Sequence, residues 1–396
     1  MKKIRKICVF TGGRAEYGIL KPLLDEIKKD LNLDLQILVS GMHLSREFGL
    51  TFKEIEKDGF MCNEKIEIIL SSDTPVSVCK SMGLGMISFS EALRRLTPDI
   101  LVILGDRFES MALATTALVS RIPIAHIQGG ELTLGAIDDQ FRHAISKMSF
   151  LHFVYTDSYR NRVIQLGENP DRVFNYGALN VDAMKKVKLL SKSRLQKNLG
   201  FNLDSKLILV TFHPTTLEKN TSGKQFSALL SAIDEFKNLK IIFTKTNADT
   251  EGRIINEKID KYVELNPDKS VSFKSLGQKL YLSTLRYVSA VVGNSSSGII
   301  ETPTFYVPTV NIGDREKGRI RADNVIDCRP DSKEIKKSLT RALSLEFKKS
   351  LENMFQPYEK KNTSKNIVNK IKKFPLPSSI KKEFFDLKIN CENEPA

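Results

Sequence analysis

Short apolar runs alternate with helix-length amphipathic segments along almost the whole chain, and this alternation is the strongest constraint on its fold. Between the first two runs, Ile19, Leu20, Leu23, Leu24 and Ile27 recur at the spacing of one helical face. Strands that alternate with helices predict parallel sheets covered by helices on both sides, so we expect an α/β protein. The expected strands are residues 6–10, 33–39, 99–105, 122–127, 150–156, 206–212, 239–244, 271–274, 290–294 and 307–312.

A polar stretch rich in lysine and serine, KKVKLLSKSRLQKNLGFNLDSK (185–206), separates the first five expected strands from the last five. A chain of 396 residues is long enough for two domains with substantial cores. We predict two Rossmann-like, doubly wound domains, residues 1–185 and 186–375, and a tail at 376–396. Ligands of such sheets bind beyond the carboxyl ends of the strands, so the site is expected in a central cleft between the domains.

Composition narrows the class of protein further. Hydrophobic residues at 41% and charged residues at 27% are typical of a soluble globular protein, and no apolar run is long enough to span a bilayer. The basic start is followed by too short an apolar stretch for a signal peptide, so we expect a cytoplasmic protein without a membrane partner. The five cysteines are far apart, which predicts neither a disulfide framework nor a metal site.

The net charge of +14 raises the alternative of a nucleic-acid or polyanion binder. Much of the excess lysine lies in the last part of the chain, where it alternates with apolar residues as on the solvated face of helices. No basic stretch is interleaved with aromatic residues, and tryptophan is absent. We therefore expect no nucleic-acid partner and a positive field that favours a small acidic substrate.

Polar side chains follow the expected strands of the first domain. Asp106 and Arg107 come directly after strand 99–105, and Glu131 follows a glycine pair after strand 122–127. Carboxylates that follow neighbouring strands meet at one edge of a sheet, which favours a site. Turn and capping roles are the alternative, above all for Asp138 or its neighbour Asp139 at the start of a helix. The same domain supplies Arg14 and Glu16 in TGGRAEYG, and Arg142 and His143 in IDDQFRHAISK.

The second domain offers a different chemistry. His213 is held at a strand end by a proline, and it is either an acid or base or a plain turn residue. In GNSSSG (293–298), the hydroxyls of Ser295 and Ser296 lie beside main-chain N–H groups at a predicted helix start. Such a turn suits a phosphate, and a simple serine cap is the alternative. With arginines nearby, the expected ligand is a nucleotide-sugar. The remaining candidates are Asn247, Asp249, Asn294, Glu301, Arg315 and Arg319.

Nine motifs occur in one order between residue 7 and about residue 330: GGRAEYG, GMHLS, LGDRFE, HIQGGE, IDDQFRHAISKMS, FHPTTLE, NADTEG, GNSSSGIIE and NIGDREKGR. In this order they resemble the hydrolysing UDP-N-acetylglucosamine 2-epimerases of sialic acid biosynthesis. The resemblance implies a GT-B-type fold, often with a C-terminal helix that crosses back to the first domain. It also implies an enzyme, for which we expect no cofactor and no metal.

The reaction of that family removes a hydrogen at C2 that is not acidic in the intact sugar. The resemblance implies that UDP departs first, that the resulting cation acidifies this hydrogen, and that elimination gives a 2-acetamidoglucal. Water then adds with inversion at C2, and the products are N-acetylmannosamine and UDP. The enzyme must stabilise a leaving diphosphate and position acids and bases at the sugar.

Carried over by motif, Asp106, Glu131 and Asp138 resemble the acid/base carboxylates, and it stays open which one takes the C2 proton. His213 resembles the group that protonates or steadies the departing phosphate. The groups that would hold UDP or the sugar are Arg14, Glu16, Arg107, Arg142, His143, Asn247, Asp249, Asn294, Ser295, Ser296, Glu301 and Arg315.

The expected substrates are UDP-N-acetylglucosamine and water. The alternative is the same reaction on UDP-2,4-diacetamido-2,4,6-trideoxyglucose (UDP-N,N′-diacetylbacillosamine) in legionaminic acid biosynthesis, which needs only changes of residues that line the pocket. Arg14-Ala15-Glu16 replaces the Arg-Pro-Glu of the non-hydrolysing branch and so favours the hydrolysing one. A retaining GT-B glycosyltransferase is a rival enzyme class. The resemblance also implies a homodimer or homotetramer.

Overall fold

Seven parallel strands form the first of two sheets in the computed structural model, which describes residues 4–387 apart from 71, 73, 216, 219 and 247–250. The strand order is β3-β2-β1-β4-β5-β6-β7. This order reverses direction between β1 and β4, where a doubly wound sheet opens its ligand-binding crevice. The bounds are β1 (Arg5–Thr11), β2 (Leu33–Ser40), β3 (Glu64–Ile66), β4 (Ile100–Leu104), β5 (Ile124–Ile127), β6 (Leu151–Val154) and β7 (Val173–Asn175).

The second sheet has six parallel strands in the order β10-β9-β8-β11-β12-β13, and it reverses between β8 and β11. Apart from the exposed Lys206 at the start of β8, its central strands β8 and β11 are buried and mostly apolar, as parallel strands covered on both faces must be. The bounds are β8 (Lys206–Thr211), β9 (Leu239–Thr244), β10 (Ser270–Phe273), β11 (Ala290–Gly293), β12 (Thr309–Ile312) and β13 (Val325–Cys328). The predicted pair of doubly wound α/β units is confirmed.

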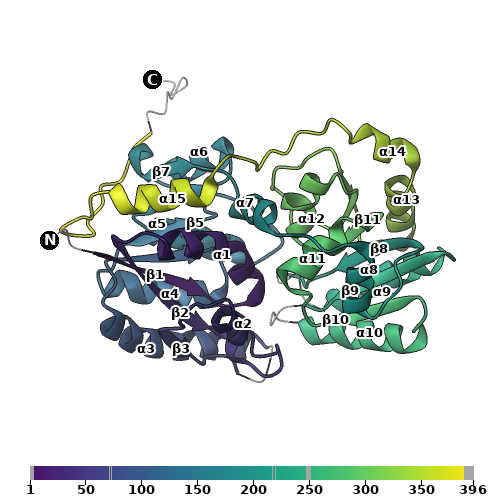
Figure 1. Cartoon of the computed structure of the whole chain (residues 1–396), viewed down its shortest axis with the longest axis horizontal. Helices are drawn as coiled ribbons and strands as arrows, with labels where there is room; N and C mark the ends of the chain where they lie inside the picture. The colour runs from purple at the N-terminus through teal and green to yellow at the C-terminus, as the bar shows by residue number, and fades with distance from the viewer. Residues whose placement is uncertain are drawn as a thin grey trace, which may run out of the picture.

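Helices cover both faces of each sheet, and the two lobes lie side by side (Figure 1). In the first lobe they are α1 (Arg14–Lys28), α2 (Phe52–Lys57), α3 (Pro75–Leu96), α4 (Phe108–Val119), α5 (Asp138–Met148), α6 (Asp157–Gln165) and α7 (Leu179–Lys186). Next come α8 (Lys192–Leu199), α9 (Ser222–Asp234), α10 (Gly252–Leu265), α11 (Gly277–Leu285), α12 (Ser297–Ile300), α13 (Ser332–Ala342) and α14 (Leu345–Ser350). The short 3-10 turns are η1 (Gly41–Leu44), η2 (Pro170–Arg172) and η3 (Thr302–Phe305).

The last helix, α15 (Thr363–Lys373), returns to the first lobe and packs on α1 and α7 (Figure 1). Its apolar face, which includes Ile367 and Ile371, joins the core that also contains α1 side chains. Arg5 of β1 donates to the main-chain oxygens of Ile371 and Phe374 and so caps the end of α15. The exact domain limits, 185 and 375, stay a prediction.

Residues 376–387 continue along the first lobe beyond α15, and we call them the strap. The Nζ of Lys382 donates to the main-chain oxygens of Lys147 and Ser149, at 2.6 and 2.7 Å, and to the buried carboxylate of Glu168. The strap therefore closes the carboxyl end of α5. The last part of the predicted tail lies outside the described residues.

Two further properties bear on function. Within the described residues, no helix has both the length and the apolar character needed to cross a membrane. Across the same part of the chain, no group of three or more His, Cys, Asp or Glu side chains is arranged to hold a metal ion.

Candidate active site

A cavity of ≈ 310 Å³ lies between the lobes, at the carboxyl ends of both sheets. It is lined from the first lobe by residues of α1, α7 and the segment after β2. From the second lobe it is lined by residues that follow β8, β9, β10, β11 and β12. The volume is within the range of small-molecule sites. The predicted site residues that line it are Arg14, His213, Ser295, Ser296, Glu301 and Arg315.

The serine turn and His213 are built as one unit. β11 ends at Gly293 with φ +140°, and a Cβ there would lie 1.9 Å from the main-chain oxygen of Thr211 on β8, so only glycine fits. The next residue, Asn294, is buried. Its side chain accepts from the N–H of His213 at 2.6 Å and donates to the carbonyl of His213 at 2.8 Å. Asn294 does not line the cavity but fixes the main chain of His213.

The helix after this turn is shorter than the sequence suggested. α12 covers four residues before the chain passes into η3, so the helix that follows the turn is about one turn long and its dipole is correspondingly small. What remains is the turn itself, with three serine hydroxyls and its main-chain N–H groups. Arg315 lies beside it, since its Nη1 donates to the oxygen of Asn294 at 3.3 Å.

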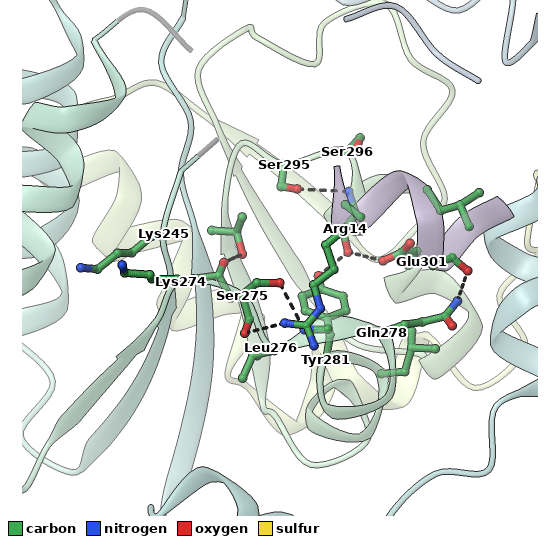
Figure 2. Close-up of a pocket in the computed structure, with 18 of the residues that line it drawn as sticks. Arg14, Lys245, Lys274, Ser275, Leu276, Gln278, Tyr281, Ser295, Ser296 and Glu301 are labelled. Atoms are coloured by element: carbon green, nitrogen blue, oxygen red, sulfur yellow. Dashed lines mark hydrogen bonds between the residues drawn. The ribbon is translucent and has the colours of Figure 1, made fainter. Parts of the chain in front are cut away.

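Glu301, one turn beyond the serines, is held from both lobes (Figure 2). Its Oε2 accepts from Ser297 at 2.6 Å, and its Oε1 accepts from Asn180 of α7 at 3.0 Å. Burial raises the pKa of Glu301, although these two hydrogen bonds oppose the shift. The carboxylate thus lines the cavity and bridges the lobes, and a ribose would have to share or displace these contacts.

Arg14 extends from the start of α1 towards the second lobe, as Figure 2 shows. Its guanidinium donates to the main-chain oxygen of Ser275 at 3.3 Å and pairs with Glu54 at 2.7 Å. Gly277 has φ +65°, and a Cβ there would lie 2.2 Å from Nη2 of Arg14. The lobes therefore meet closely at this point. Gln278 adds a second link by donating to the oxygen of Gly18 at 2.6 Å.

The segment 274–278, which comprises the loop after β10 and the first two residues of α11, was missed by sequence reasoning, although it contributes five residues to the cavity wall. It follows β10, an expected strand, so the rule that sites follow strand ends would have found it. Its sequence, KSLGQ, carries one charged residue and no carboxylate or histidine, and therefore gave no chemical signal.

The predicted carboxylates of the first lobe do not line the cavity, but two of them are joined by one buried arginine. Asp106 follows β4, and its side chain is 17% exposed and paired with the buried Arg142 of α5. Nη1 of Arg142 donates to the main-chain oxygen of Glu131 at 3.1 Å and to the hydroxyl of Thr133 at 3.0 Å. Arg142 therefore joins the loops after β4 and β5.

Glu131 itself is wholly buried, and its partners come from both lobes. Its Oε2 accepts from Gln128 at 3.0 Å and from Arg319, which lies in the loop after β12. Burial raises the pKa of Glu131, and the nearby Arg319 opposes that shift. The two glutamates around Arg319 raise the pKa of its guanidinium against the effect of burial, so Arg319 stays charged.

Asp138 and Asp139 are the first two residues of α5, and the N-cap position before them is occupied by Ile137, so neither aspartate is the N-cap residue. The capping expectation is therefore wrong. Asp139 is buried and accepts from the N–H of Thr133 at 2.5 Å, and it pairs with His143 at 3.5 Å. Although burial works against ionisation, these contacts lower the pKa of Asp139. Asp138 and His143 are partly exposed and lie outside the lining set.

Glu16 and Arg107 lie at the reversal point of the first sheet, after β1 and β4. Glu16 accepts from the N–H of Gly12 at 2.7 Å. Burial raises its pKa to about 7, with Arg107 opposing and Glu109 reinforcing the shift. Nε of Arg107 donates to the buried Glu109 at 3.2 Å. Neither residue lines the cavity. Two further candidates, Asn247 and Asp249, lie outside the described residues.

Two Rossmann-type lobes that close on a cavity with arginines, serine hydroxyls and a histidine define a GT-B-type enzyme that acts on a nucleotide-linked substrate. The profile of the family described as UDP-N-acetylglucosamine 2-epimerase matches residues 25–372. The chain belongs to this family, and it is an enzyme of the hydrolysing UDP-sugar 2-epimerase type.

Three curated relatives share much of the sequence. The "GDP/UDP-N,N'-diacetylbacillosamine 2-epimerase (hydrolyzing)" of Campylobacter jejuni is 47% identical, over 87% of this chain and 89% of that protein. The "Polysialic acid biosynthesis protein P7" of Escherichia coli is 37% identical, over 97% and 98%. The "UDP-N,N'-diacetylbacillosamine 2-epimerase (hydrolyzing)" of Legionella pneumophila is also 37% identical, over 82% and 85%.

Solved structures share the fold. The crystal structure of the UDP-GlcNAc 2-epimerase of Neisseria meningitidis bound to UDP-GlcNAc superposes with a TM-score of 0.77 at 17% identity. The match covers 92% of this chain and 99% of that chain. The GT-B architecture is therefore confirmed over both lobes.

Proposed function

We propose that the enzyme converts a nucleotide-linked 2-acetamido sugar and water into the free, C2-inverted sugar and the nucleoside diphosphate. The reaction proceeds by elimination to a glycal and hydration of that glycal. The observation that carries this proposal is the convergence of Arg14, His213, Ser295, Ser296 and Arg315 on one cavity between the lobes. Two arginines, a histidine and hydroxyls beside main-chain N–H groups are what a leaving diphosphate requires.

In the first step, the bond between C1 and the phosphate oxygen breaks and the electron pair stays on the phosphate. Arg315 and the serine turn receive that charge in a site that is preorganised, because Gly293 and Asn294 fix the turn to β8. His213 lines the same cavity, and its main chain is held on both sides by Asn294. We assign it to protonation or hydrogen bonding of the departing oxygen.

We assign the removal and return of the C2 proton to the carboxylates of the first lobe. When the C2–H bond breaks, its electron pair forms the C1=C2 double bond and the proton passes to a base. Water then adds hydroxyl to C1, and C2 receives a proton on the opposite face. Asp106 and Glu131 are our candidates, because they follow the neighbouring strands β4 and β5 and because Arg142 joins the side chain of Asp106 to the main chain of Glu131. Asp138 stays a third candidate.

For the sugar, we place the 2,4-diacetamido-2,4,6-trideoxy substrate first. The relative with 47% identity and one of the two with 37% identity carry names with that sugar. A place in the biosynthesis of a legionaminic-type acid then follows. UDP-N-acetylglucosamine, the substrate expected from sequence, is the second candidate, and a relative named for it is 30% identical over 86% of this chain. The nucleotide is proposed as UDP.

Turnover of the purified enzyme in heavy water tests the reaction class. We expect free sugar that carries one deuterium at C2, because the C2 proton is lost and regained from solvent. A sugar without deuterium at C2, or sugar transferred to an acceptor, contradicts elimination and favours a glycosyltransferase. Parallel assays with the two UDP-sugars, and with the GDP form of the diacetamido sugar, then rank substrates by kcat/KM.

A further inference from the structure

Four alternating charges connect the wall of the cavity to Glu131 across the lobe interface. Arg315 donates to Oε1 of Glu316, and Nε of Arg319 lies 2.5 Å from Oε2 of the same carboxylate. Nη1 of Arg319 donates to Oε2 of Glu131. We call these four residues the ion chain. Its first three members come from the loop after β12, and its last member comes from the loop after β5.

Only one end of the ion chain meets the cavity. Arg315 lines it, and its side chain is 15% exposed. The side chains of Glu316, Arg319 and Glu131 are 0%, 4% and 0% exposed. Charges so far from water interact strongly and are poorly screened by salt. A change in charge at Arg315 is therefore felt along the whole chain.

Of the two carboxylate oxygens of Glu131, Oε1 is the one that can take up a proton. Its Oε1 is buried and accepts no hydrogen bond from the residues that the structure describes. Its Oε2 is occupied by Gln128 and Arg319. The other titratable or charged groups whose field reaches Glu131, or that contact its main chain, are Glu316, Tyr155, Tyr159, Tyr358 and Arg142. Glu316 and the tyrosines supply no positive charge, and Arg142 contacts the main-chain oxygen of Glu131, so Arg319 is the cation that pairs with its carboxylate.

We propose that Arg319 is a positioning residue that couples the charge at the diphosphate site to the proton affinity of Glu131. This inference rests on the proposed function, in which the diphosphate binds beside Arg315 and Glu131 takes part in proton transfer. A diphosphate draws Arg315 towards itself and away from Glu316. Glu316 then relies on Arg319 alone, and Arg319 neutralises Glu131 less.

The direction of this coupling suits the reaction. As the C1–O bond breaks, negative charge grows on the phosphate that Arg315 faces. The ion chain passes this charge on, so Glu131 holds a proton more readily at the moment when C2 must lose one. When the nucleotide leaves, Arg315 returns to Glu316 and Glu131 becomes acidic again.

Proton uptake on UDP binding tests the coupling without turnover. Calorimetry in two buffers of different ionisation enthalpy, at pH 8 where UDP is fully ionised, measures the protons bound per UDP. We expect uptake in the wild-type enzyme, none in Glu131→Gln and a marked loss in Arg319→Gln. Arg319→Lys should retain part of it. The exposed Arg329→Gln is the control for loss of one positive charge and should match the wild type.

The pH dependence of kcat gives an independent and directional readout. The limb of the profile that Glu131→Gln abolishes identifies that carboxyl. Glu316→Gln leaves Arg319 wholly to Glu131 and should move this limb to lower pH, by about 1 unit. Arg319→Gln removes the cation and should move it to higher pH by a similar amount. A residue with only a structural role lowers kcat and shifts neither limb.

The inference is overturned if Glu316→Gln and Arg319→Gln move the pH profile of kcat in the same direction. It is also overturned if a folded Arg319→Gln protein takes up as many protons on UDP binding as the wild type. If Arg319→Gln does not fold, Arg319→Lys and Glu316→Gln carry the same test. Failure of the proposed function looks different. In that case the wild-type product lacks deuterium at C2, whatever the proton uptake, or UDP does not bind in the cavity.

Discussion

At the residue scale, the buried carboxyl of Glu16 lowers the stability of the folded protein by an amount that depends on pH. Burial at the start of α1 raises the pKa of its carboxyl from 4.5 to about 7. The carboxyl has a higher pKa in the folded protein than in the unfolded chain, so the folded protein binds this proton more tightly. The free energy of unfolding therefore falls as pH rises from about 4.5 to about 7.

We therefore expect Glu16→Gln to be more stable than the wild type at pH 8, by roughly 1–2 kcal/mol, and the gain to fade at pH 4. The amide oxygen of Gln can still accept from Gly12, so the main-chain contact survives. Urea unfolding at both pH values measures the difference. An equal effect at pH 4 and pH 8 contradicts an ionisation of Glu16.

Asn294 is a second residue whose role differs from its neighbours on the serine turn. Because its amide holds both main-chain groups of His213, Asn294→Ala frees the histidine while leaving the serines and Arg315 in place. We expect kcat to fall about 10- to 100-fold, with a change in UDP affinity of less than about fivefold. Steady-state kinetics and UDP titration separate the two. A loss confined to UDP affinity would instead make Asn294 a ligand contact.

At the scale of elements, the strap makes the carboxyl end of α5 depend on a distant part of the chain. Lys382 satisfies two carbonyls there and neutralises Glu168 together with Lys147. Lys382→Met should cost about 2–3 kcal/mol of stability, because it leaves these buried acceptors short of a partner. The adjacent, exposed Lys381→Met is the matched control. Equal thermal stability of the two variants contradicts this role of the strap.

The sequence predicted the central strands well and the edges poorly. All ten expected strands are present, whereas β3, β7 and β13, which were not expected, are edge strands of three or four residues. A central parallel strand is buried on both faces and so reads as an apolar run, but an edge strand as short as EKI carries no such signal.

Part of the candidate site could also be predicted from the sequence. Asp106 and Ser295 directly follow recognisable apolar strands, and in the structure those strands lie where each sheet reverses its strand order. Partners that come from the other lobe could not be found. Asn180 reaches Glu301, and Arg319 reaches Glu131, only through the packing of two lobes, which no local pattern encodes.

At the scale of the whole molecule, the lobes approach each other closely where Gly277 meets Arg14. Gly200 has nearly the same backbone conformation, φ +61° against +65°, but no atom lies within 4 Å of its missing Cβ. Alanine at either site should therefore cost about 1 kcal/mol of backbone strain. Only Gly277→Ala should also displace Arg14 and weaken UDP binding, by about tenfold. Equal UDP affinities in both variants contradict a role of this contact in ligand binding.

Because α15 returns to the first lobe, the lobe that is synthesised first cannot complete its folding until the end of the chain has been made. A ribosome releases the strands of the first sheet long before it reaches Ile367 and Ile371, which cover α1 and α7. Until then, the apolar surface of α1 and α7 that α15 covers stays exposed on the nascent chain. Chaperone contact during translation should concentrate on that surface, and the lobe made first is the one finished last.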